Sequence, residues 1–120
     1  MKSSLTFGSL FSGIGGMDLG LEQAGLQCRW QVEINEYACR VLAKHWPSVR
    51  RHGDVRTFPP DDGLSWGVDL IAGGFPCQDI SLAGKGAGLD GVQSSLWFEF
   101  IRIIRVIRPR YVLVENSPGL

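Results

Sequence analysis

The chain has 120 residues, which is enough for one domain with a modest hydrophobic core. Its 12 basic and 12 acidic side chains give a net charge of zero, whereas a domain that grips nucleic acid through phosphates alone is usually strongly basic. Any contact with nucleic acid should therefore be local or shared with another segment. No apolar stretch approaches the length of a membrane span, and the first residues lack a signal-peptide core and cleavage pattern, so we expect an intracellular protein.

Predicted strands and helices alternate along the chain. Apolar or alternating runs predict strands at 4–11, 28–34, within 50–55, at 68–76 and within 110–120. Apolar residues at helical spacing predict helices at 15–25, 35–47 and 95–109, the last of them amphipathic. Asn35 is a suitable N-cap for the second helix, and Gly25, Pro47 and Pro109 mark helix ends. Segments 58–67 and 83–95 have the composition of loops.

This alternation implies an α/β fold with a parallel sheet and right-handed crossovers. Ligands of such sheets lie outside the carboxyl ends of the strands, near the point where the strand order reverses. An unusual group follows or ends each predicted strand, namely the glycine cluster from Gly13, then Glu33, Asp54, Cys77 and Glu115. Their convergence on one edge predicts a ligand site more strongly than any single motif does.

The glycine cluster and Glu33 resemble a nucleotide-binding arrangement. Gly13, Gly15 and Gly16 would let the backbone turn tightly beside a ligand, although an ordinary glycine turn is the alternative. Glu33 lies 20 residues after Gly13, where a carboxylate can accept hydrogen bonds from ribose hydroxyls. Asp18 stands where the GxGxxG pattern has glycine, and its charge disfavours a pyrophosphate. The pattern therefore favours an adenosine ligand without phosphates.

The three cysteines are widely spaced and form no CxxC pair, which argues against a disulfide framework and a zinc site. We interpret Cys28 and Cys39 as small buried hydrophobic residues. Cys77 follows a strand end, where a thiolate would face the ligand crevice. A Cys–His hydrolase would need a histidine partner, and neither His45 nor His52 is an obvious one.

Two acidic residues at strand ends have both structural and functional interpretations. Asp54 can cap its loop or accept the amino group of adenine, and the two are equally plausible from the sequence. Glu115 follows a run of apolar residues and is either a partly exposed strand-end acid or a carboxyl that holds a proton in the crevice. We expect the arginines between 102 and 110 to form a solvated helix face.

Five motifs in order resemble the DNA cytosine-C5 methyltransferases. They are FGSLFSGIGGMDLGLEQAG, VEINEYA, GDV, GGFPCQDIS and VLVENSPG, and together they extend from Phe7 to Gly119. The resemblance implies a Rossmann-like S-adenosylmethionine-dependent methyltransferase fold, truncated after about five parallel strands. Residues 1–120 would be the N-terminal portion of the catalytic domain, in a cytoplasmic protein of bacterial or phage type.

The resemblance also implies roles for individual residues. Cys77 would be the nucleophile, and Glu115 would contact the target cytosine. S-adenosylmethionine would be bound by Phe11, Gly13, Ile14, Gly15, Gly16, Glu33, Ile34, Asp54, Val55, Pro76 and Leu96. DNA would be contacted by Gln78, Ser81, Lys85 and Asn116, with the loop 82–91 closing over a duplex from which the cytosine is flipped out. No metal and no membrane is expected.

The family continues well past ENSPG, with an arginine-bearing motif, a target-recognition region and a C-terminal segment. We therefore expect these 120 residues to be about the first third of such an enzyme and not to methylate DNA alone. The first alternative is a non-catalytic S-adenosylmethionine-binding fragment, or one half of a split methyltransferase whose partner is a separate C-terminal half. A tRNA methyltransferase of the same type comes next. A nicotinamide dehydrogenase and a thiol hydrolase are disfavoured.

Overall fold

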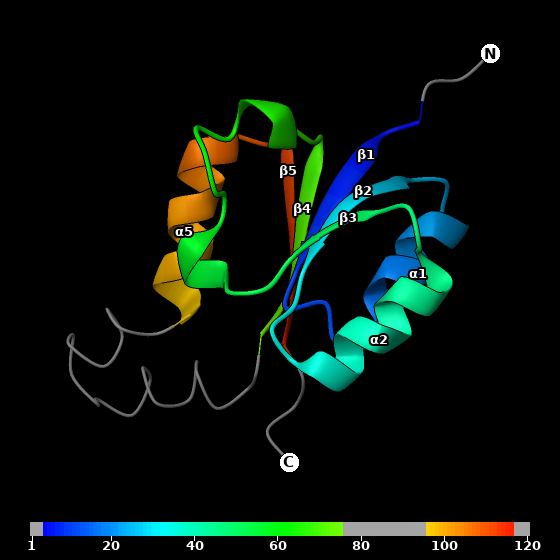
Figure 1. The fold of residues 1–120 in the computed structure, drawn as a ribbon. Helices are drawn as coiled ribbons and strands as arrows, with labels where there is room; N and C mark the ends of the chain where they lie inside the picture. Colours follow the sequence, from blue (N-terminus) through cyan, green and yellow to red (C-terminus); the bar gives the residue numbers. More distant parts are fainter. Residues whose placement is uncertain (1–3, 76–95, 117–120) are drawn as a thin grey trace.

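The computed structural model describes residues 4–75 and 96–116 (Figure 1). Within them, five strands form one sheet in the order β3-β2-β1-β4-β5, and every neighbouring pair is parallel. The chain leaves β1 outward to β2 and β3 and then returns to β4, so the strand order reverses between β1 and β4. The strands are β1 (Thr6–Leu10), β2 (Gln27–Val32), β3 (Arg50–His52), β4 (Leu70–Phe75) and β5 (Tyr111–Asn116). The predicted parallel α/β sheet is confirmed.

Helices cover both faces of this sheet (Figure 1). Helices α1 (Gly16–Gln23) and α2 (Glu36–His45) lie on one face, and α5 (Leu96–Ile107) lies on the other. The side chain of Asn35 accepts a hydrogen bond from the Ala38 backbone at 2.9 Å, which confirms it as the N-cap of α2. None of the helices in the described ranges is long and apolar enough to cross a bilayer.

The larger core cluster lies between the sheet and α5. Trp30 of β2 is fully buried, and its indole Nε1 donates to the backbone oxygen of Trp66 at 2.8 Å. Phe58 packs between the two tryptophans, with ring centroids 4.7 Å and 4.9 Å away. Both Phe58 and Trp66 come from segment 58–67, which contains the short 3-10 helix η2 (Leu64–Trp66). This segment therefore supplies core side chains, although its composition predicts only a loop.

Gly8 of β1 allows the Trp30 ring to lie flat against the neighbouring strand. A Cβ at this position would come within 2.1 Å of the Trp30 ring, so any other residue would displace the indole. On the opposite face a smaller cluster packs beneath α2, and it consists of Phe7, Cys28, Leu42 and Trp46. The β1–β2 part of the sheet is thus covered on both faces.

Strand β5 contrasts with β1 and β2. It forms the edge of the sheet, and its apolar side chains remain between 40% and 49% exposed, these being Tyr111, Val112, Leu113 and Val114. A parallel strand with a continuous apolar run is normally covered on both faces. Within the described residues, β5 is apolar in sequence without being buried.

Candidate functional site

A cavity of about 290 Å³ opens at the carboxyl ends of β1, β2 and β3; we call it the β2-side pocket. Its walls come from the loops after these strands and from the first residue of α5. Six of its lining residues are ones that the sequence assigned to a cofactor, namely Phe11, Glu33, Ile34, Asp54, Val55 and Leu96. Val32, Gly53 and Arg56 complete the lining. The structure therefore brings together residues from three of the five motifs, and Leu96 from outside them.

The loop from Phe11 to Gly16, here the glycine loop, leaves β1 in an unusual backbone conformation. Phe11 has φ +57°, and Gly13 and Gly15 have φ +58° and +94°. A left-handed conformation is rare for a non-glycine residue and needs support from its surroundings. The Ser12 amide supplies part of that support by donating to the Val32 oxygen at 3.2 Å.

Glu33 holds the glycine loop from the neighbouring strand. Its Oε1 accepts from the Gly13 amide at 2.8 Å, and its Oε2 accepts from the Asn35 amide at 2.9 Å. A carboxylate has about four acceptor positions, so both oxygens retain capacity for a ligand hydroxyl. Glu33 thus fixes the loop after β1 against the start of α2 while its carboxylate borders the pocket.

Asp54 adopts the capping role in this structure. Its carboxylate accepts from the Arg56 amide at 2.9 Å and pairs with the Arg56 side chain at 3.1 Å. The hydrogen bonds from Arg56 lower the pKa of Asp54, and the side-chain hydrogen bond contributes more than the backbone one. The cap begins the short 3-10 helix η1 (Val55–Thr57), which forms one wall of the β2-side pocket.

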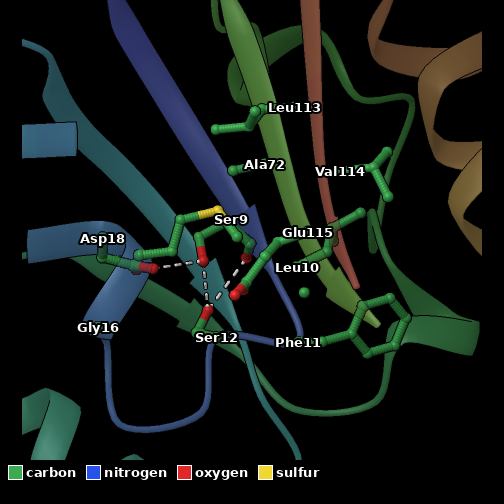
Figure 2. A pocket seen from close by; sticks show the side chains of 12 residues that line it. Ser9, Leu10, Phe11, Ser12, Gly16, Asp18, Ala72, Leu113, Val114 and Glu115 are labelled. Atoms are coloured by element: carbon green, nitrogen blue, oxygen red, sulfur yellow. Dashed lines mark hydrogen bonds between the residues drawn. The ribbon is translucent and has the colours of Figure 1, made fainter. Parts of the chain in front are cut away.

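A second cavity, of about 590 Å³, lies where the strand order reverses; we call it the β4-side pocket. The glycine loop, α1, β4 and β5 form it, and Figure 2 shows the Glu115 side chain extending toward the side where Ser9 and Ser12 lie. A Cβ on Gly74 would meet Glu115 Oε1 at 3.6 Å and the Phe11 oxygen at 3.7 Å. Glu115 therefore lies beside the backbone of the glycine loop.

A buried chain of hydrogen-bonded polar side chains, here the polar chain, runs from this pocket into the sheet. It was not predicted from the sequence. Asp18 of α1 is 0% exposed and accepts from Ser9 Oγ and Gln31 Nε2, both at 2.9 Å. Ser9 Oγ is also 2.8 Å from Ser12 Oγ, and Arg51 donates to Gln31 Oε1 at 3.2 Å. Burial raises the pKa of Asp18. The polar residues Ser9 and Gln31 within apolar strands were the available signal.

In α1, Leu19 is among the apolar residues whose spacing predicts the helix at 15–25, yet it is 50% exposed. Asp18 faces the interior instead. In α2, Ala38 and Leu42 are buried as their spacing indicates, but Tyr37 is 65% exposed. Helical spacing therefore predicts some buried positions correctly, such as Ala38 and Leu42, and others wrongly, such as Leu19 and Tyr37.

Two further interpretations from the sequence need correction. Cys28 is buried as expected, and burial raises its pKa to about 12, but Cys39 is only half-buried and its thiol donates to the Glu33 oxygen at 3.0 Å. Arg102 belongs only in part to a solvated helix face: its side chain is 40% exposed, but its guanidinium donates to the backbone oxygens of Val55 and Phe58. Arg105 lies on the exposed side, as predicted.

The remaining predicted residues are not gathered in the β2-side pocket. Ile14, Gly15 and Gly16 line a separate groove between α1 and α2, and Gly16 also borders the β4-side pocket. Cys77, Pro76, Gln78, Ser81 and Lys85 lie outside the described residues, as do the loop 82–91 and the side chain of Asn116. In the part of the chain that is described, no three His, Cys, Asp or Glu side chains form a group that could hold a metal ion.

Comparison with known proteins identifies relatives along almost the whole chain. The type II methyltransferase M.Eco47II of Escherichia coli is 45% identical over 92% of this chain, and M.NgoFVII of Neisseria gonorrhoeae is 39% identical over 93%. The matched parts are 27% and 30% of those proteins, so the chain spans less than a third of their length.

A solved structure and a family model agree with these relatives. The structure, described as a DNA modification methyltransferase encoded within an E. coli prophage, matches 97% of this chain and 33% of its own, with a TM-score of 0.76 and 32% identity. The family model for C-5 cytosine-specific DNA methylases matches residues 5–120. The chain therefore belongs to the family of C-5 cytosine-specific DNA methylases.

Proposed function

We propose that residues 1–120 form the N-terminal, cofactor-binding and nucleophile-bearing portion of a cytoplasmic DNA cytosine-5 methyltransferase. The observation that supports this most strongly is the β2-side pocket. Six residues assigned to the cofactor, five of them from three motifs and the sixth Leu96, line one cavity at the carboxyl edge of a parallel sheet. Ligands of open α/β sheets bind at this edge.

The lining of the β2-side pocket suits the adenosine part of S-adenosylmethionine. Phe11, Ile34 and Val55 offer apolar surface to a flat ring, while Glu33 has acceptor capacity for ribose hydroxyls. Asp54 retains lone pairs beside its Arg56 contacts, which an amino group on the ring can use. The cavity of about 290 Å³ is close to the lower end of small-ligand pockets, about 300 Å³. The apolar surface and the acceptors present therefore fit the cofactor.

In this proposal, the β4-side pocket receives the flipped cytosine. Carbon 5 of cytosine is a poor nucleophile until a thiolate adds to carbon 6 and moves electron density onto carbon 5. Cys77 would supply that thiolate, and its role is inferred from the GFPCQ motif. Glu115 would hold a proton at ring nitrogen 3 while the negative charge develops. S-adenosylmethionine supplies the methyl group; a base then removes the proton from carbon 5, and the thiolate leaves.

Strand β5 and the length of the relatives support a need for further protein. The net charge of zero offers little general attraction to DNA, and β5 leaves apolar side chains exposed at the sheet edge. We propose that the remaining portion of the methyltransferase, as a continuation of this chain or as a separate C-terminal half, covers β5 and grips double-stranded DNA. Residues 1–120 would add local contacts to the DNA through Gln78, Ser81, Lys85 and Asn116.

Trapping with 5-fluorocytosine DNA tests the reaction, because fluorine at carbon 5 prevents the last elimination and leaves the thiolate attached. We expect a covalent complex to form with cofactor present when the remaining portion of the enzyme is supplied. The variant Cys77→Ser should form none, while Cys28→Ser should behave as the wild type. An adduct that survives in Cys77→Ser would refute the nucleophile assignment.

Calorimetry with S-adenosylhomocysteine separates a catalytic portion from a non-catalytic cofactor-binding fragment. Binding without an adduct, even with the remaining portion present, would favour the fragment. Glu33→Gln retains one acceptor oxygen and should bind more weakly than wild type. Glu33→Ala should bind more weakly still, because the Gly13 amide of the glycine loop loses its acceptor. The absence of any binding at millimolar ligand would exclude a cofactor site.

A further inference from the structure

The guanidinium of Arg102 in α5 connects this helix to the wall of the β2-side pocket. Its Nη1 donates to the Phe58 oxygen at 2.8 Å, and its Nη2 donates to the Val55 oxygen at 2.9 Å. Glu99, one turn earlier on the same helix, accepts from Arg102 Nε at 2.9 Å and forms an ion pair with Nη2 at 2.8 Å. The guanidinium is therefore fixed from two sides and presents two donors to the same short turn.

The two carbonyl groups belong to Val55, the first residue of η1, and to Phe58, which directly follows its last residue. Within this turn, the Thr57 amide donates to the Asp54 oxygen at 3.0 Å, and the Phe58 amide donates to the Val55 oxygen at 3.2 Å. A single 3-10 turn with two backbone hydrogen bonds has little stability of its own. Its position therefore depends on outside contacts, and Arg102 supplies two charge-assisted hydrogen bonds to it.

Helix α5 is a firm base for this contact. Phe100 and Ile103, on either side of Arg102, are 1% and 0% exposed in the core between the helix and the sheet. The same helix places its first residue, Leu96, in the wall of the β2-side pocket, which Asp54, Val55 and Arg56 also line. One rigid element thus sets two walls of the cavity, one through Leu96 directly and the other through the guanidinium of Arg102.

We propose that Arg102 is a positioning residue for the cofactor pocket: it clamps η1 so that Asp54 and Val55 stay at the distance from Leu96 that adenosine requires. This inference rests on the proposed function of the β2-side pocket. The planar fork of arginine reaches two carbonyl oxygens at once, whereas a lysine ammonium at the same place can hold only one of them firmly. Lysine keeps the charge and the helix propensity, so Arg102→Lys isolates the bridging geometry.

The first experiment measures ligand affinity in the intact protein by calorimetry, using S-adenosylhomocysteine and adenosine. If Arg102→Lys lowers the population of the binding-competent pocket to about a tenth, the apparent Kd for both ligands rises about tenfold. The matched control is Arg105→Lys on the exposed side of the same helix, which should bind as the wild type does. Glu99→Gln, which weakens the hold on Arg102 from the side, should give a smaller increase. In the assembled methyltransferase, Arg102→Lys should raise KM for S-adenosylmethionine and leave kcat nearly unchanged.

The second experiment follows amide hydrogen exchange without ligand. In Arg102→Lys, exchange at Thr57 and Phe58 should accelerate, while exchange at Ile71 in the core strand stays at the wild-type rate. An equal acceleration at all three amides would indicate general destabilisation and would overturn the inference. Wild-type affinity in Arg102→Lys would also overturn it, with the proposed cofactor site left intact. Failure of the wild-type protein to bind either ligand would instead refute the proposed function, and the inference with it.

Discussion

The centre of the sheet and its β5 edge differ in burial. Strand β1, in the centre, is covered on both faces, with Phe7 at 0% and Leu10 at 1% exposure. Strand β5 has the longer apolar run, yet Val112 and Leu113 are 45% and 40% exposed. Since apolar runs in parallel strands normally indicate coverage on both faces, the composition of β5 indicates that further protein covers it. The covered centre borders the β2-side pocket, and the exposed edge is where we propose that further protein packs.

Aromatic residues in one row of the sheet give the largest expected contrast. Phe7 and Tyr111 both pair in register with Leu70, one from each side. Phe7→Ala should lower the free energy of unfolding by about 3–5 kcal/mol, because it leaves a cavity in the core. Tyr111→Ala should cost about 1 kcal/mol or less, because the ring is already 49% exposed. Urea unfolding of the two variants measures the difference, and equal losses would contradict the contrast in burial.

The polar chain in the covered centre of the sheet should be the next most sensitive feature. Asp18→Leu leaves the buried Ser9 hydroxyl and Gln31 amide without their acceptor, at about 1–3 kcal/mol for each unsatisfied group. Asp18→Asn can restore both contacts, because its oxygen accepts from Gln31 and its amide donates to Ser9, whose hydroxyl then turns to Ser12. Urea unfolding should therefore rank Asp18→Asn well above Asp18→Leu. A reversed ranking would show that the site prefers an apolar side chain.

The same residue predicts how stability changes with pH. Burial raises the pKa of Asp18 above 3.8, so the folded state binds the proton more tightly than the unfolded state does. The stabilisation that the Asp18 proton gives to the folded state is therefore fully present below pH 3.8 and is lost as the pH rises through the folded pKa of Asp18. Asp54 and Asp69 have lowered pKa values and act in the opposite direction, so the wild type must be compared with Asp18→Asn. Relative to wild type, the variant should gain stability from pH 3.8 toward neutrality; a constant difference would contradict the raised pKa.

The fold and the edge that carries the site were predictable because both depend on patterns local to the sequence. Apolar runs separated by helical spacing define the strands, and parallel strands place their carboxyl ends on one edge. That logic brought Glu33 and Asp54 to one cavity. The motifs then identified the family, which the comparisons confirm. The assignment of Cys77 as nucleophile stays a prediction, because the residue lies outside the described ranges.

What the sequence could not reveal depends on which side chains meet across the fold. Arg102 contacts backbone oxygens 44 and 47 residues away, and no periodicity in its own helix encodes that contact. Asp18 occupies a helix position that suits a solvated acid, and only Ser9 and Gln31 on two strands make its burial possible. Such polar contacts over long sequence separations are determined by the tertiary structure, which overrides the local preference of each residue.

The smallest expected effect on stability concerns the exposed edge strand β5. Val112→Lys should change the free energy of unfolding by about 0.5 kcal/mol or less, because a lysine can extend its ammonium into water from this half-exposed position. The same variant should prevent adduct formation on 5-fluorocytosine DNA when the remaining portion of the enzyme is supplied, since a charge would enter the interface proposed for β5. Arg105→Glu, on the exposed side of α5, serves as a control for a surface charge elsewhere. Normal adduct formation by Val112→Lys would show that the partner portion packs on another face, and the exposure of β5 would then have no role in assembly.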